Sequence, residues 1–74
     1  MVNIELKGHL YWYANKKKTF SIGNFEGSLE NLIMLLKLPQ SEVGTLLVNQ
    51  KKEPLSYIVK DNDHIILIPV VGGG

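Results

Sequence analysis

The chain has 74 residues, 45% hydrophobic and 20% charged, which is the composition of one small folded domain and not of a disordered segment. Its net charge is +1 and all eight basic residues are lysines, so the bidentate arginine contacts common in nucleic-acid recognition are excluded. The sequence has no cysteine, which excludes disulfides, thiolate metal sites and a catalytic thiol. We expect a domain stabilised by packing, with no nucleic-acid partner.

Membrane insertion and export are not expected either. The N-terminal segment has no signal-like apolar region, and no apolar run approaches the length of a membrane span. We expect a cytoplasmic protein that contacts no membrane and is a monomer when free.

Two strands are predicted in the first third of the chain. Apolar and polar residues alternate from Val2 to Leu6, as in a strand with one buried face, and Gly8 ends this pattern. The alternation returns from Thr19 to Ile22, before a Gly23-Asn24 turn signal. We expect an antiparallel hairpin whose long loop covers residues 9–15.

The middle of the chain predicts one helix. Ser28 is a good N-cap, the following residues form a broad apolar helical stripe, and Pro39 ends the helix just after Leu38. A short strand is predicted at residues 45–49, followed by a polar turn at 49–54. Residues 55–59 are expected to form a short irregular or edge segment.

The last strand is predicted at the centre of the sheet. A turn at residues 61–63, with Asn62 suited to the left-handed conformation, leads into the most apolar stretch of the chain, residues 64–70. The predicted domain spans residues 1–71, and Gly72–Gly74 form a flexible tail. The predicted fold class is α+β, with one main helix across a mixed sheet of four or five strands.

The last strand is apolar on both faces, although a sheet covered by one helix needs only one apolar face. Ile65 and Leu67 share one face, and the residues between and after them share the other. The outer face is either a docking surface or is covered by loops or by residues 55–59. The predicted partner-docking face consists of Leu47, Ile66, Ile68 and Val70.

Other candidate residues favour structural roles. The aromatic residues 11–13 are expected to close one end of the core, since this is commoner in small domains than stacking on a ligand. His9 and His64 have no second ligand at metal spacing, and Asp61 and Asp63 fit turn chemistry. We predict no metal site and no catalytic residues.

A triglycine after a buried strand projects a thin backbone that can enter a narrow channel. Adenylation of a terminal carboxylate by ATP creates a good leaving group, which a sulfur nucleophile can displace. A frayed terminus is the alternative interpretation of this short motif. On the glycines alone, the frayed terminus is the favoured interpretation.

The ordered elements together resemble the β-grasp, ubiquitin-like fold, and their sequences resemble the ThiS/MoaD family of sulfur carriers, specifically the small subunit of molybdopterin synthase. The similar segments cover almost the whole chain, and the most specific is Pro69-Val70-Val71-Gly72-Gly73. The other similar segments are residues 8–14, 28–39, 43–49 and 61–69.

The resemblance implies a carrier without catalytic activity or a cofactor of its own. A ubiquitin-activator-like (E1-like) adenylating enzyme, using ATP and Mg, would bind the sheet face and draw in Gly72–Gly74. The thiocarboxylate would form on Gly74, or on Gly73 after trimming, because the family usually ends at the second glycine. The large subunit of molybdopterin synthase, or another sulfur-accepting enzyme, would then use the sulfur.

We expect a role in molybdopterin or tungstopterin biosynthesis. The alternatives are sulfur supply for thiamine thiazole or tRNA thiolation, ubiquitin-like modification of lysines, and a non-covalent β-grasp interaction module.

Overall fold

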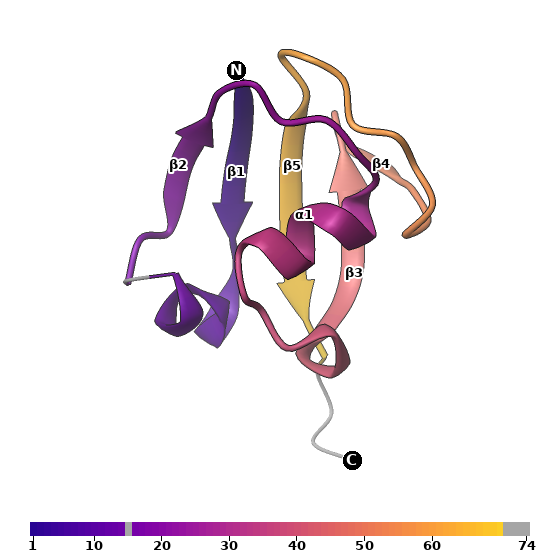
Figure 1. The fold of residues 1–74 in the computed structure, drawn as a ribbon. Coiled ribbons are helices and arrows are strands. Elements are labelled where there is room, and N and C mark those ends of the chain that lie inside the picture. Colours follow the sequence, from indigo (N-terminus) through magenta and orange to yellow (C-terminus); the bar gives the residue numbers. More distant parts are fainter. Residues whose placement is uncertain (15, 71–74) are drawn as a thin grey trace.

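A computed structural model describes residues 1–14 and 16–70 and has one mixed five-stranded sheet crossed on one face by a single α-helix (Figure 1). The α-helix, α1, spans Leu29–Leu35. Two short 3₁₀ helices, η1 (Gly8–Tyr13) and η2 (Gln40–Glu42), precede β2 and β3 respectively. The strands are β1 (Val2–Leu6), β2 (Thr19–Ile22), β3 (Val43–Val48), β4 (Lys51–Lys52) and β5 (His64–Pro69).

The strand order is β2-β1-β5-β3-β4, so the last strand lies at the centre of the sheet, as the sequence predicts. β1 and β2 form the predicted antiparallel hairpin. β5 runs parallel to β1 and antiparallel to β3. This topology, with α1 across one face, is the β-grasp arrangement expected from the sequence.

The helix begins as predicted and ends earlier. Ser28 caps its start, because the Ser28 hydroxyl accepts from the Asn31 N–H and the Asn31 side chain accepts from the Ser28 N–H. At the other end Lys37 is left-handed (φ 60°), and the Leu38 N–H donates to the Ile33 carbonyl. This Schellman motif ends α1 before Pro39 is reached.

The core lies between α1 and the sheet. Ile65 and Leu67 of β5 are fully buried there, as the parity of the strand predicts. Val48 is also buried, and Leu46 packs against the core from a partly exposed position. The other fully buried large side chains are Ile4, Leu10, Leu29, Leu32 and Ile33.

The prediction for the aromatic residues is wrong in part. The loop expected at residues 9–15 contains η1, and Leu10 of η1, not an aromatic ring, is fully buried. Tyr11 does pack against the core. Trp12 and Tyr13 do not close it, because their side chains are 58% and 42% exposed.

The region after β3 also differs from the prediction. Asn49 and Gln50 both have positive φ, as in a two-residue hairpin turn, so Lys51 and Lys52 can pair with β3 as the short edge strand β4. Residues 55–59 are irregular, as predicted. Their carbonyl groups at Leu55 and Tyr57 accept hydrogen bonds from the first turn of α1, which places this segment beside the helix.

Val71, the last residue of the predicted domain, and the predicted tail Gly72–Gly74 lie outside the described residues, as does Asn15. Within the described part, no helix has the length and apolar character needed to cross a membrane.

Candidate partner-docking face and tail root

An apolar patch lies on the sheet face opposite α1. Leu47 of β3 is the cross-strand partner of Ile66 of β5, and Ile68 lies two residues further along β5. All three side chains are partly exposed, and none belongs to the core cluster. We call Leu47, Ile66 and Ile68 the outer patch. Residues 55–59 lie beside α1 and do not cover it.

Charged groups border the outer patch on β1. Glu5 is the other cross-strand neighbour of Ile66, and its carboxylate pairs with the Lys7 ammonium group. His64 Nε2 lies 3.5 Å from the second carboxylate oxygen. The hydrogen bond from Lys7 is the main cause of a lowered pKa at Glu5, so this carboxylate stays ionised near neutral pH. The patch therefore has an apolar centre and a charged edge.

A shallow hollow of about 280 Å³ adjoins the outer patch, lined by Ile66, His64 and the turn residues Asn49 and Gln50. Its walls provide amide and imidazole groups next to an apolar side chain. An apolar centre with a polar edge is the usual anatomy of a protein interface.

Pro69, the last residue of β5, and Val70 after it are held in place by backbone contacts, and we call these two residues the tail root. The Val70 N–H donates to the Glu42 carbonyl at 2.9 Å. The β3–β5 register shifts between Val43 and Thr45, which places Gly44 at a bulge. A Cβ at Gly44 would lie 3.1 Å from the N and Cα atoms of Val70, closer than ordinary packing allows. Glycine at this bulge lets β3 approach the tail root.

A second glycine contacts the tail root from η1. Gly8 has φ +56°, and a Cβ there would meet Pro69 Cγ at 2.6 Å. Both the backbone conformation and the contact therefore favour glycine. Val70, which directly follows β5, is 50% exposed. Pro69 and Val70 are thus held by contacts with Gly8, Gly44 and the Glu42 carbonyl.

The other end of β5 is anchored by the buried carboxylate of Asp63. It accepts hydrogen bonds from the Lys60 N–H (2.8 Å), the Asn49 amide (2.9 Å) and the Tyr57 hydroxyl (2.9 Å). Burial alone would raise the pKa of Asp63, but these hydrogen bonds outweigh it and the pKa is lowered. Asn62 is left-handed (φ 70°), as the turn prediction required.

The histidines do not gather with other ligands. Within residues 1–14 and 16–70, no three His, Cys, Asp or Glu side chains are placed to hold a metal ion. His9 Nε2 lies 3.9 Å from a Glu42 carboxylate oxygen, next to the tail root.

The structure brings three of the four predicted docking residues together and places Val70 at the end of the same strand. The predicted acceptors Gly73 and Gly74 lie outside the described residues. Sequence reasoning missed the roles of Gly8, Gly44 and Glu42, since a close backbone approach leaves no periodic pattern. The one available signal was a glycine inside the third strand.

Residues 17–74 match the family model described as the ThiS family. No curated protein matches the sequence. The matched range includes α1, all strands except β1, and the glycine tail.

Solved structures are similar in fold over nearly the whole chain. Urm1 from Trypanosoma brucei gives a TM-score of 0.77 at 17% identity, covering 99% of this chain and 94% of that one. A chain of the Amycolatopsis orientalis BexX/CysO complex gives a TM-score of 0.69 at 19% identity, with full coverage of both chains. A chain of the complex of subunits 1 and 2 of the Helicobacter pylori 26695 molybdopterin-converting factor gives 0.62 at 26%, covering 99% and 97%.

These neighbours agree with the β-grasp topology, and the family match covers most of the chain, including the outer patch and the tail root. The chain therefore belongs to the ThiS family of ubiquitin-like sulfur carriers.

Proposed function

We propose that this protein carries sulfur as a thiocarboxylate on its C-terminal glycine, most specifically for molybdopterin or tungstopterin biosynthesis, and that it has no catalytic activity of its own. The observation that carries the proposal is the arrangement of side chains on β5 and the position of its end. The strand presents Ile66 and Ile68 on the uncovered face and leads through a fixed tail root into the glycines. One strand thus connects the outer patch to the glycines that we propose as the acceptor.

The chemistry requires activation by a partner. The glycine carboxylate attacks the α-phosphate of ATP, with Mg²⁺ held by the partner, and pyrophosphate leaves. Hydrosulfide, a sulfur donor at the oxidation level of a thiocarboxylate, then attacks the acyl carbon, AMP leaves, and loss of the sulfur's proton gives the thiocarboxylate. Glycine suits the acceptor position because it puts no side chain beside the carbonyl. Gly74 is the proposed acceptor, or Gly73 if the last residue is trimmed.

Two protein partners are proposed. An E1-like adenylating enzyme would bind the outer patch and receive the tail, and a sulfur-accepting enzyme would bind afterwards. The four residues after Val70 reach at most about 14 Å. With Gly74 as the acceptor, a partner's ATP site would lie close to the bound sheet face, and the fixed position of the tail root suits that arrangement. Two of the structural neighbours come from complexes with a second protein.

The pathway is proposed from the likeness to a chain of the Helicobacter pylori molybdopterin-converting factor, at 26% identity. A thiamine biosynthesis protein from Geobacter metallireducens, at 24% identity and a TM-score of 0.55, keeps sulfur supply for thiamine as the second candidate.

The test is intact-mass analysis after incubation with the cognate adenylating enzyme, ATP, Mg²⁺ and a sulfur donor. We expect an oxygen-to-sulfur mass change confined to the C-terminal peptide. Variants lacking Gly74, or both Gly73 and Gly74, identify the acceptor. Omitting ATP is the control, and it should leave the mass unchanged.

An unchanged mass with an enzyme that adenylates another carrier of the same organism would contradict the carrier function. Attachment of the terminal glycine to lysines, detected as branched peptides without any thiocarboxylate, would instead support a ubiquitin-like modifier.

A further inference from the structure

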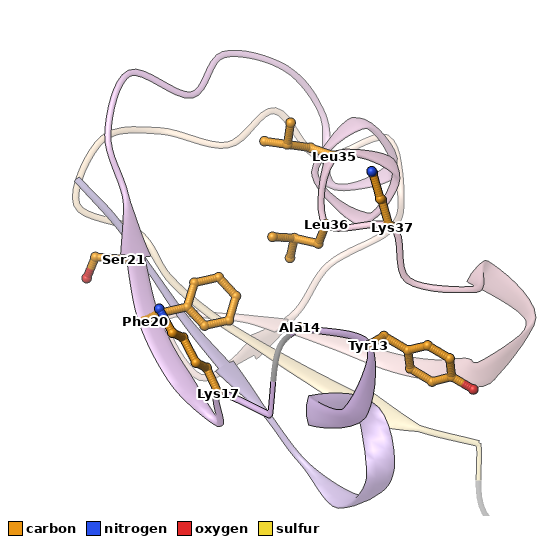
Figure 2. Close-up of a pocket in the computed structure, with 8 residues that line it drawn as sticks. All are labelled: Tyr13, Ala14, Lys17, Phe20, Ser21, Leu35, Leu36 and Lys37. Carbon is orange, nitrogen blue, oxygen red and sulfur yellow. The ribbon is translucent and has the colours of Figure 1, made fainter.

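Figure 2 shows a groove of about 490 Å³. Phe20, which lines it, is the cross-strand partner of the buried Ile4, so the groove lies on the helix side of the sheet and the outer patch on the other side. The groove runs between the C-terminal end of α1 and the segment that joins η1 to β2. Phe20 and Leu36 face each other across it, and Leu35 extends over it from the helix. Phe20 and Leu36 also pack against the core, so the floor of the groove is part of the folded domain.

The groove is bordered by positive charge. Lys17 and Lys37 line it from the strand side and the helix side. No carboxylate is among the described residues that line it. Two more lysines continue this charge on η1, since Lys16 lies over the Trp12 ring and Lys18 over the Tyr11 ring. Two of the eight lysines therefore line one apolar groove, and two more lie over aromatic rings of the neighbouring η1.

Two of these lysines occupy backbone conformations that ordinarily favour glycine. Lys37 has φ 60° at the residue after the helix C-cap, and Lys16 has φ 61°. The Schellman hydrogen bonds fix the position of Lys37 beside the groove. Glycine would give the less strained backbone at both positions, while Lys16 gains its contact with the Trp12 ring and Lys37 adds a positive charge beside the groove.

Large apolar side chains are unusually exposed near the groove. Leu35 and Tyr13 line it and are 57% and 42% exposed. Their sequence neighbours Met34 and Trp12 are 66% and 58% exposed. An exposed apolar surface of this kind, rimmed by one sign of charge, is typical of a protein-docking site.

We propose that this groove binds an acidic segment of a partner protein, in which apolar anchors flanked by Asp or Glu enter between Phe20 and Leu36 while the carboxylates pair with Lys17 and Lys37. An acidic segment is the expected ligand because the lysines that line the groove are complementary in charge to Asp and Glu. The lysines sit on both walls of a concave apolar site, whereas single-stranded nucleic acid favours exposed stacking faces along a basic track. Such a segment would leave the outer patch and the tail root free, so two partners could bind at once.

The experiment is a selection of a random peptide library displayed on phage against the wild-type protein, followed by affinity measurements on the selected peptides. Trp12 is the single tryptophan and precedes the lining residue Tyr13 in the chain, so its fluorescence is followed on peptide addition, and calorimetry gives the affinity. We expect enriched peptides with acidic residues beside apolar ones. Their affinity should fall as salt is raised.

The decisive variant is K17Q/K37G. Glycine relieves the left-handed strain at residue 37, so the free energy of unfolding should stay equal or rise. Peptide affinity should fall about tenfold, since two charge-assisted contacts are lost. The control K51Q/K60Q removes the same charge outside the groove and should bind as the wild type does. L35Q, at an exposed apolar position, should also weaken binding.

The proposal is overturned if the enriched peptides lack acidic residues, or if K17Q/K37G binds them as tightly as the control does. It is also overturned if an oligouridine or vesicles of anionic lipid bind the groove more tightly than the selected peptides, with the same dependence on Lys17 and Lys37.

Discussion

The two faces of β5 carry the same kind of side chain and have different surroundings. Ile65 and Leu67 are fully buried under α1, whereas Ile66 and Ile68 are partly exposed on the outer face. The sequence of the strand does not distinguish them by residue type. The two faces differ only because α1 and residues 55–59 lie on the side of Ile65 and Leu67. Apolar character along a central strand therefore serves folding on one face and remains available for partner binding on the other.

The largest expected effect is on the buried face. Leu67→Ala removes a fully buried side chain next to α1 and should lower the free energy of unfolding by about 2–5 kcal/mol. Urea denaturation measures this change. Ile68→Ala on the outer face is the matched control and should cost clearly less. Equal losses at both positions would remove the distinction between the two faces.

The second-largest effect is expected when a charged side chain is introduced into the outer patch. Leu47→Asp should reduce affinity for the adenylating enzyme by more than tenfold, or about 2 kcal/mol, because it places a carboxylate in the apolar centre of the interface. Lys52 is the cross-strand partner of Leu47 and can pair with the new carboxylate, so the loss of stability should be smaller than for Leu67→Ala. Calorimetric titration gives the affinity. Unfolding of the variant would show that Leu47 belongs to the core.

The third prediction concerns the buried anchor before β5. Asp63→Asn should cost about 1–3 kcal/mol at neutral pH, since the amide nitrogen cannot accept from one of the three donors. The pKa of Asp63 is lowered in the folded state, so its stabilisation is present above the unfolded pKa of about 4 and is lost as pH falls through the folded pKa. Denaturation between pH 2 and pH 7, about the range of carboxylate titration, should show a shallower acid loss in the variant. An unchanged pH profile would contradict the role of this network.

The smallest effect on stability is expected at the tail root. Gly44→Ala adds a Cβ 3.1 Å from the Val70 backbone, so the chain must move by a few tenths of an ångström. We expect a loss below about 1 kcal/mol and slower adenylation, since the tail leaves the sheet in a changed direction. Gly23→Ala is the control, because a Cβ there meets nothing within 4 Å. Equal adenylation rates for the two variants would show that the tail root has no positioning role.

Much of the fold follows from local patterns. The alternation in β1 and β2, the cap at Ser28 and the apolar run of β5 each predict an element and its face. Two features of the fold were not predicted from the sequence. The helix ends at a Schellman motif that has lysine where glycine is usual. Lys51 and Lys52, predicted to lie in a turn, pair with β3 and form β4. Both depend on a residue whose type gives no signal for the left-handed conformation that it adopts, Lys37 after the helix and Gln50 in the turn.

The part of the candidate site that follows the alternation of side chains along a strand was predicted from the sequence. The part that depends on close contacts between backbone segments was not. Parity placed Leu47, Ile66 and Ile68 on one face, and the structure agrees on that placement. The contacts of Gly8 and Gly44 with the tail root join residues distant in sequence. The exposure of Trp12 and Tyr13 arises because Leu10 already fills the end of the core.

The most direct test of the division between the two faces is a cross-saturation experiment on methyl groups, with the labelled protein bound to its adenylating enzyme. Irradiation of the enzyme should attenuate the methyl signals of Ile66, Ile68 and Leu47 and leave those of Ile65 and Leu67 unchanged. Attenuation of Leu35 and Leu36 instead, with the outer-patch signals intact, would contradict the account.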